Sequence, residues 1–230
     1  MTTISANLQA VNARIAAACA AAGRAPAAVT LLAVGKTFPA AVLRAAHAAG
    51  QQAFGESYVQ EALAKQAELT GLALEWHFIG PLQSNKTRPV AEHFDWVHSV
   101  ERLKIAERLS AQRPASLPPL NVCVEVNVSG EASKNGCAPE EAPALCRAVA
   151  ALPNLRLRGL MAIPEPTQDS ALARRRFAAL RTLRDELNAA GLVLDTLSMG
   201  MSHDLEAAIT EGATIVRVGT AIFGERNYAQ

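Results

Sequence analysis

The sequence predicts a single (β/α)8 barrel, or TIM barrel, with an extra helix at its N-terminus, over residues 1–230. Eight short apolar or β-branched runs alternate with Ala- and Leu-rich stretches of helical character, which is the pattern of successive βα units. The length of 230 residues is close to the value of about 250 that is typical of this fold. Neither a linker nor a shift in composition divides the chain, so we expect one domain.

The first predicted element is a helix that precedes the first strand. Leu8, Val11, Ile15 and Cys19 recur at helical spacing, as in an amphipathic helix. The run 15–22 resembles the apolar part of a signal peptide, but it is short and its flanks do not fit one. We therefore expect a helix of the fold in this place and no secretion signal.

The eight predicted strands follow in order, each bounded by helix or turn signals. Pro39 marks a helix start, and Gly50 and Gly191 follow helix ends. The strands are expected near residues 30–34, 52–54, 74–79, 95–99, 120–127, 155–161, 194–198 and 214–218. This number of βα units favours a closed barrel over an open doubly wound sheet, which usually has fewer strands.

Side-chain alternation along a strand predicts which residues point into the barrel. The inward residues expected on the first, fifth and eighth strands are Leu32, Val34 and Lys36, then Cys123, Glu125 and Asn127, then Ile215, Arg217 and Gly219. The chemistry of this fold is carried at the carboxyl ends of its strands. We therefore expect Lys36, Asn127, Met161, Ser198 and Arg217 to gather around one mouth.

Lys36 is the most informative residue, because it ends an apolar run where a buried strand surfaces. A lysine amine becomes nucleophilic when burial or a neighbouring cation such as Arg217 lowers its pKa. Two glycine-containing turns, 198–202 and 217–220, each follow a strand and can offer backbone N–H groups to a phosphate. An amine beside a phosphate site suggests pyridoxal phosphate. The alternative is a solvated lysine at a strand end.

The two turns also contain the residue types that a phosphate site needs. Gly200 and Gly219 permit close approach of the backbone, and Ser202 and Thr220 add hydroxyl donors. Helix starts after the seventh and eighth strands commonly bind phosphate in this fold. The alternative is that Ser202 is only a helix N-cap and Gly219 only a turn residue.

Arg217 bears on the kind of chemistry expected. A pyridine nitrogen that faces a permanent guanidinium donor stays neutral and makes a poor electron sink. Such a site would hold the cofactor but activate it weakly. The alternative is an ion pair inside the barrel between Arg217 and an inward acid such as Glu125.

Charge and cysteine usage narrow the possible partners and the compartment. The chain has 22 Lys and Arg against 21 Asp and Glu, which predicts no binding of nucleic acid or of an anionic membrane. No run is long enough to span a bilayer. The four cysteines form no C-x-x-C pair, so we expect reduced thiols, no zinc site and a cytoplasmic protein.

Several segments resemble the pyridoxal phosphate homeostasis proteins, and the resemblance extends from Leu31 to Tyr228. The segments with this specific resemblance are 54–61, 76–86, 158–164, 198–202 and 219–224. The resemblance implies a barrel similar to the N-terminal domain of alanine racemase, with the cofactor held as a Schiff base on Lys36. It also implies phosphate contacts around Ser202, Gly219 and Thr220, and Arg217 near the pyridine nitrogen.

The resemblance further implies a carrier, buffer or regulator of intracellular pyridoxal phosphate that affects amino-acid and keto-acid balance, without a reaction of its own. Transient contact with enzymes that need the cofactor is the partner expected. Two residues depart from the family pattern: Ser57 stands where Asn is usual, and Gly35 where Ser is common. The predicted cofactor-binding residues are Lys36, Ser57, Asn127, Met161, Ser198, Met199, Gly200, Ser202, Arg217, Gly219 and Thr220, with no catalytic residue and no metal ligand.

Two enzymatic alternatives use the same residues. An amino-acid racemase or decarboxylase needs a second acid or base on the opposite face of the ring, for which only the phenols Tyr58 and Tyr228 are available. A Schiff-base aldolase acting on a sugar phosphate would share the lysine and the phosphate site. His77, on the third strand, is expected to be a hydrogen-bonded core histidine rather than a ligand.

Overall fold

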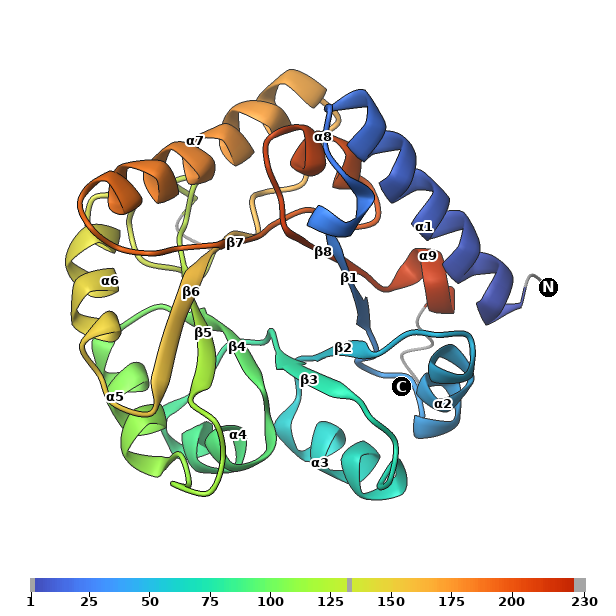
Figure 1. Cartoon of the computed structure of the whole chain (residues 1–230), viewed down its shortest axis with the longest axis horizontal. Helices are drawn as coiled ribbons and strands as arrows, with labels where there is room; N and C mark the ends of the chain where they lie inside the picture. Colours follow the sequence, from blue (N-terminus) through green and yellow to red (C-terminus); the bar gives the residue numbers. More distant parts are fainter. Residues whose placement is uncertain (1–2, 132–133, 226–230) are drawn as a thin grey trace.

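Eight parallel strands form a closed barrel in chain order, and the last strand pairs with the first (Figure 1). The computed structural model describes residues 3–131 and 134–225. The strands are β1 (Thr30–Val34), β2 (Ala53–Glu56), β3 (Glu75–Phe78), β4 (Trp96–Val100), β5 (Leu120–Glu125), β6 (Leu155–Met161), β7 (Thr196–Ser198) and β8 (Ile215–Val218). The predicted fold class and all the predicted strands are confirmed, with shifts of a few residues at some ends.

Helices surround the barrel and cover its outer face (Figure 1). The α-helices are α1 (Ile4–Ala21), α2 (Ala40–Ala48), α3 (Val59–Glu68), α4 (Thr87–His93), α5 (Leu103–Gln112), α6 (Ala142–Ala150), α7 (Ser170–Ala189), α8 (Leu205–Thr210) and α9 (Thr220–Phe223). Two short 3-10 helices, η1 (Pro26–Ala28) and η2 (Ser84–Lys86), lie in connections. Each strand is followed by helical structure, as the alternation of sequence patterns predicts.

The strands divide the apolar core into an inner and an outer part. The inner part fills the barrel with Leu32, Val34, Ala53, Ile79, Trp96, Cys123, Met161 and Ile215. The outer part packs the other strand faces, such as Val122 and Val124, against the helices. Of the predicted inward residues, Leu32, Val34, Cys123 and Ile215 belong to this inner part, because a strand alternates its faces with a period of two.

The extra helix α1 packs beside the two short helices α8 and α9 (Figure 1). Its buried residues are Leu8, Val11, Ile15, Ala18 and Cys19, which confirms the predicted amphipathic pattern. Arg14 pairs with Glu206 at 2.8 Å and also donates to the Ser202 carbonyl. Asn7 Nδ2 donates to the Ile222 carbonyl at 2.8 Å. The helix thus holds the segments that follow β7 and β8.

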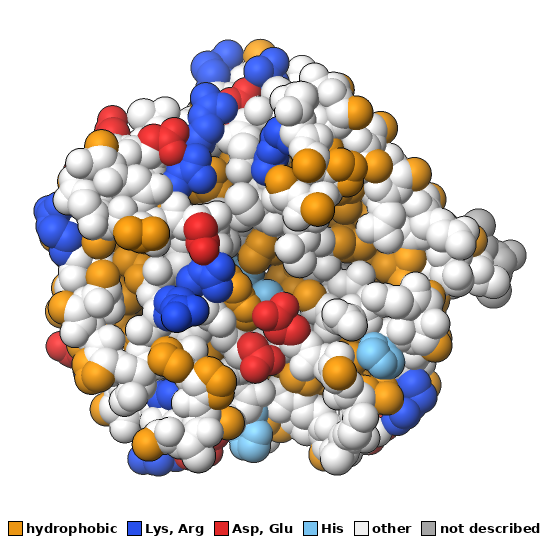
Figure 2. All heavy atoms as spheres, in the orientation of Figure 1, with side chains coloured by type: hydrophobic (Ala, Val, Ile, Leu, Met, Phe, Trp, Pro, Cys, Tyr) orange, Lys and Arg blue, Asp and Glu red, His pale blue; other side chains and the backbone are white. Residues whose placement is uncertain are grey.

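The surface is mixed in charge, as the near-neutral composition predicts. Figure 2 shows acidic, basic and histidine side chains near the middle of one face, and dispersed apolar side chains elsewhere. All four cysteines are free and buried. Within residues 3–131 and 134–225, no helix is long and apolar enough to cross a membrane, and no group of acidic, histidine or cysteine residues could hold a metal ion.

Candidate functional site

A cavity of about 180 Å³ lies at the carboxyl ends of the strands. Its polar lining comes from Lys36 after β1, from Arg217 on β8, and from Ser202, Gly219 and Thr220 in the last two turns. Val34, Ile79 and Ile163 form apolar walls, and Met201 and His203 complete the lining. No carboxylate is among the described residues that line it. The cavity therefore combines cationic groups with apolar walls, which suits an anion attached to a flat ring.

The structure brings five of the predicted site residues to this cavity and leaves six outside its lining. Those that line it are Lys36, Ser202, Arg217, Gly219 and Thr220. Those that do not are Ser57, Asn127, Met161, Ser198, Met199 and Gly200. Met161 and Met199 are fully buried and belong to the inner and outer core respectively, so both have a packing role.

Arg217 is held inside the barrel by hydrogen bonds. Its Nη1 donates to Ser198 Oγ at 2.7 Å and its Nη2 to the Ala162 carbonyl at 2.9 Å. Burial lowers the pKa of the guanidinium to about 10, and nearby Glu125 acts in the opposite direction. No ion pair joins Arg217 to Glu125 within the described chain, so the expected alternative of an interior salt bridge is not what the structure contains. Ser198 is thus a neighbour of Arg217.

Asn127 organises the loop after β5. Its Nδ2 donates to the Glu131 carbonyl at 2.8 Å, and its Oδ1 accepts from the Gly130 N–H at 3.1 Å. The strand ends at Glu125, two residues earlier than expected, and the β5–β6 register shifts between Val122 and Cys123. The side chain is therefore committed to its own loop.

Both sides of Lys36 are fixed by three charged residues from β2 and α3, which we call the Lys65 cluster: Lys65, Glu56 and Glu61. Lys65 Nζ donates to Glu56 Oε1 at 2.7 Å, to Glu61 Oε1 at 2.5 Å and to the Gly35 carbonyl at 2.7 Å. Glu61 Oε1 also accepts from the Thr37 N–H at 2.6 Å. The peptide groups on either side of the lysine are thus both bonded to this cluster.

The backbone at Thr37 is unusual, and this fits its place beside Lys36. Its φ is 70°, a left-handed conformation that costs a β-branched residue energy. Its buried Oγ1 has no hydrogen-bond partner among the described residues. The bond from its N–H to Glu61 opposes this strain, so the sharp turn presents Lys36 at the mouth.

Glu56 explains why glycine precedes the lysine. A Cβ at Gly35 would lie 2.9 Å from Glu56 Oε1 and 2.9 Å from a Leu43 methyl group. Glu56 is fully buried, and burial raises its pKa to about 7 in spite of the lowering effect of Lys65 and Lys36. Its Oε2 has no hydrogen-bond partner in the described part of the chain. A carboxyl group with a pKa close to neutral pH therefore interacts electrostatically with the Lys36 amine.

The turn after β7 needs glycine at position 200 for two reasons. Its φ is 93°, and a Cβ there would come within 2.5 Å of the Ala208 Cβ. Asp204 Oδ1 accepts from the Met201 N–H at 2.6 Å, so this carboxylate is tied into the turn. Asp204 is also the N-cap residue of α8, which rules out Ser202 for that position. The Ser202 hydroxyl is therefore not used as a cap.

The Lys65 cluster and His98 were not predicted from the sequence. His98 lies on β4 with the same parity as Trp96, which is part of the inner core. The alternation rule applied to β1, β5 and β8 would have found it. Lys65 and Glu61 gave no local signal, because a lysine and a glutamate four residues apart on a helix usually form a solvated pair. Lys65 is instead 4% exposed.

The comparisons with known proteins agree with this geometry. Residues 6–227 match the family model described as "Alanine racemase, N-terminal domain". The pyridoxal phosphate homeostasis protein of Pseudomonas aeruginosa is 70% identical over 228 residues, which cover 99% of this chain and 98% of the relative. The pyridoxal phosphate homeostasis protein of Escherichia coli is 53% identical over 238 residues, and this match covers 100% of this chain and 100% of the relative.

A solved structure extends the comparison to the fold. The structure of PipY from Synechococcus elongatus with pyridoxal phosphate bound matches with a TM-score of 0.81 and 42% sequence identity. The match covers 91% of this chain and 100% of PipY.

Proposed function

The chain belongs to the family of alanine racemase N-terminal domains and to its pyridoxal phosphate homeostasis proteins, and we propose that it binds pyridoxal phosphate at the mouth cavity. One observation carries the proposal. A lysine amine, a buried arginine and two hydroxyl-bearing turns line one cavity that contains no carboxylate in its described lining. PipY, with 42% identity, was solved with the same cofactor.

The residues of the cavity fit the groups of this ligand. Lys36 supplies the primary amine for a Schiff base with its aldehyde. Ser202 and Thr220 supply hydroxyl donors, and the start of α9 supplies backbone N–H groups that have no acceptor within the helix. Arg217 supplies a guanidinium donor, and Val34, Ile79 and Ile163 supply apolar walls. When bound, the cofactor supplies an aldehyde and an electron-withdrawing ring.

Uptake of the cofactor by the apo-protein tests this proposal. We expect an absorbance band in the visible region when pyridoxal phosphate is titrated in, and we expect Lys36→Ala to lose the band. Lys104→Ala is the matched control, because Lys104 is an exposed lysine on α5. A wild-type protein that takes up no cofactor, or a band that persists in Lys36→Ala, contradicts the proposal.

We further propose that the protein carries or buffers the cofactor and does not turn over amino acids. Among the described residues that line the cavity, His203 is the only titratable side chain besides Lys36 and Arg217, and it is exposed. Tyr58 is 53% exposed and outside the lining, while Tyr228 lies outside the described residues. A guanidinium donor at the ring nitrogen would also keep the ring a weak electron sink.

Exchange of the α-hydrogen of amino acids in deuterated water separates a carrier from an enzyme. The loaded protein should exchange no faster than free pyridoxal phosphate at the same concentration. Exchange that is clearly faster, and that is lost in Lys36→Ala, would support the racemase or decarboxylase alternative.

A carrier must also release its ligand to recipients. We propose that the recipients are enzymes that need pyridoxal phosphate and that they make transient contact with the mouth. The four free cysteines fit the reducing cytoplasm as the compartment. Transfer to an apo-enzyme that outpaces dissociation into buffer would support direct contact, and equal rates would contradict it.

A further inference from the structure

A chain of hydrogen bonds crosses the barrel interior from its floor to Arg217. Glu75 Oε2 lies 3.1 Å from His77 Nε2, and His77 Nδ1 lies 2.9 Å from His98 Nε2. His98 Nδ1 lies 2.8 Å from Ser198 Oγ, which accepts from Arg217 Nη1 at 2.7 Å. We call these residues the interior chain. Its members come from β3, β4, β7 and β8, so it spans the lumen.

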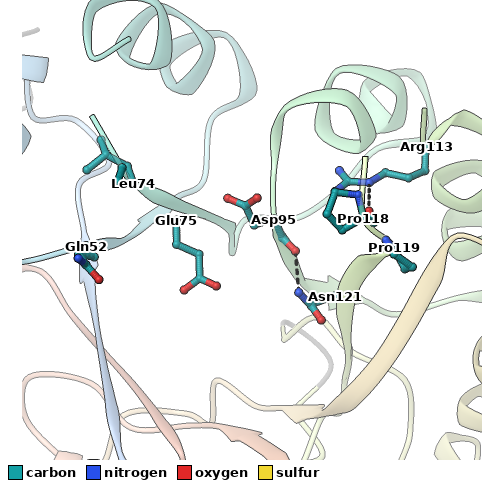
Figure 3. A pocket seen from close by; sticks show the side chains of 9 residues that line it. Gln52, Leu74, Glu75, Asp95, Arg113, Pro118, Pro119 and Asn121 are labelled. Carbon is teal, nitrogen blue, oxygen red and sulfur yellow. Dashed lines mark hydrogen bonds between the residues drawn. The ribbon is translucent and has the colours of Figure 1, made fainter. Parts of the chain in front are cut away.

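The two ends of the interior chain differ in exposure. Glu75 opens β3 and its side chain is 47% exposed in a hollow at the amino-terminal ends of the strands. Figure 3 shows this hollow, with Glu75 directed toward its middle and Asp95 and Asn121 on the neighbouring strand ends. His77, His98, Ser198 and Arg217 are each at most 3% exposed. Glu75 is therefore the only described member with a largely exposed side chain, whereas Arg217 at the other end faces the mouth cavity.

Elementary hydrogen-bond chemistry fixes the direction of every bond. Arg217 can only donate, so Ser198 Oγ accepts from it. A carboxylate can only accept, so a His77 ring that carries a single proton holds it on Nε2, facing Glu75. His77 Nδ1 is then an acceptor, and His98 must present its proton on Nε2. His98 Nδ1 accepts in turn from the Ser198 hydroxyl.

Only this arrangement satisfies all the bonds at once. Burial, and next His77 and Arg217, hold the pKa of His98 well below its usual value, which agrees with a neutral ring. If His77 instead donated from Nδ1, His98 would have to donate to Ser198, and the serine proton would lose its acceptor. The carboxylate of Glu75 thus determines, through two rings, where the hydroxyl proton next to Arg217 points.

We propose that Glu75 and the interior chain position Arg217 for the cofactor ring, so that a residue at the barrel floor controls the binding site at the mouth. This inference rests on the proposed function. The guanidinium has further N–H donors beyond the two that bond Ser198 and the Ala162 carbonyl. With Ser198 kept as a pure acceptor toward Arg217, those remaining donors keep a fixed direction. Glu75, His77 and His98 are positioning residues, because none of them is in the lining of the mouth cavity.

The first test needs no cofactor. Nitrogen-15 NMR of the imidazole rings distinguishes Nε2–H from Nδ1–H tautomers, and the protein has 5 histidines, of which His77 and His98 are the buried ones. We expect both rings of the wild-type apo-protein to be neutral Nε2–H tautomers near neutral pH. A charged ring, or an Nδ1–H tautomer at His98, overturns the proposal even if the protein binds pyridoxal phosphate.

The second test replaces the carboxylate of Glu75, which can only accept hydrogen bonds. In Glu75→Gln the amide can donate as well as accept, so the direction of the bonds is no longer fixed. We expect mixed tautomers at His98, about tenfold weaker binding of pyridoxal phosphate and a shifted absorbance band. Glu107→Gln is the matched control, because Glu107 is an exposed acid on α5, outside the interior chain. It should leave all three readouts unchanged.

Two results of the second test would contradict the proposal. One is a Glu75→Gln protein with unchanged tautomers. The other is a protein with mixed tautomers whose affinity and band equal those of the wild type. If Glu75→Gln fails to fold, the tautomers of the wild-type protein still test the proposed bond directions. If the wild-type protein binds no cofactor, the proposed function fails, but the NMR test of the interior chain remains valid.

Discussion

Lys65→Met is the substitution from which we expect the largest loss of stability at the mouth. Methionine has a similar length and helix propensity, so the change removes the ammonium group while it keeps most of the packing. Three acceptors lose their donor: Glu56, Glu61 and the Gly35 carbonyl. Glu61 and the Gly35 carbonyl lie on either side of Lys36, so the substitution should weaken both the fold and the binding site.

The magnitude follows from the burial of the cluster. Removal of one partner from a buried ion pair typically costs about 3–5 kcal/mol. Glu61 is 31% exposed and can be rehydrated, and Glu56 has a pKa of about 7 and can take up a proton. We therefore expect the lower end, about 3 kcal/mol. With a urea slope of about 3 kcal/mol/M, the unfolding midpoint falls by about 1 M.

The dependence on pH gives the sign of the effect. At about pH 5 Glu56 is protonated in the folded state, so no buried charge is left behind when Lys65 is removed. At about pH 8 the wild-type carboxylate is ionised and paired, whereas the variant must protonate it or bury its charge alone. The loss should thus be larger at the higher pH.

Urea unfolding followed by circular dichroism at both pH values measures this loss. Lys104→Met, on the exposed side of α5, is the matched control and should change the midpoint little. A Lys65→Met midpoint that equals the control, or a loss that is larger at about pH 5, would refute the reasoning.

Three further expectations concern single residues. Burial raises the pKa of Glu125 from an ordinary 4.5 to about 7. The contribution of this group to stability is therefore complete below pH 4.5 and is lost as pH rises through 7. In urea unfolding, Glu125→Gln should raise the free energy of unfolding by about 1–3 kcal/mol above pH 7 and leave it unchanged near pH 4. Gly35→Ala should cost about 1–3 kcal/mol of unfolding free energy through crowding, and Gly35→Ser less, because its hydroxyl can donate to Glu56; equal losses would contradict this. Ser202→Ala should weaken binding of pyridoxal phosphate about fivefold in titrations but leave pyridoxal, which lacks the phosphate, unaffected; a loss for both ligands would place the hydroxyl elsewhere.

Much of the fold could be predicted because the signals are periodic and local. Leu8, Val11, Ile15 and Cys19 define one helix face, and all four are buried as expected. The boundaries were harder where a polar residue continues a strand. β2 runs through Gly55 and Glu56 beyond the expected end, because Lys65 from the next helix compensates the buried carboxylate.

The site residues likewise fall into those with a local sequence signal and those without one. Lys36, Arg217 and the two turns follow from strand ends and from glycine and hydroxyl residues, which a sequence displays directly. Asn127 differs because an asparagine at a strand end can bond either a ligand or its own loop, and strand alternation does not distinguish these. The interior chain requires the pairing of β3, β4, β7 and β8, which only the closed barrel provides.

Covalent capture at a single lysine tests the central claim most directly. The apo-protein is loaded with pyridoxal phosphate, reduced with borohydride, and analysed by intact mass and peptide mapping. We predict one added cofactor per chain, located on Lys36. Modification spread over surface lysines, with Lys36 unmodified, would contradict the account.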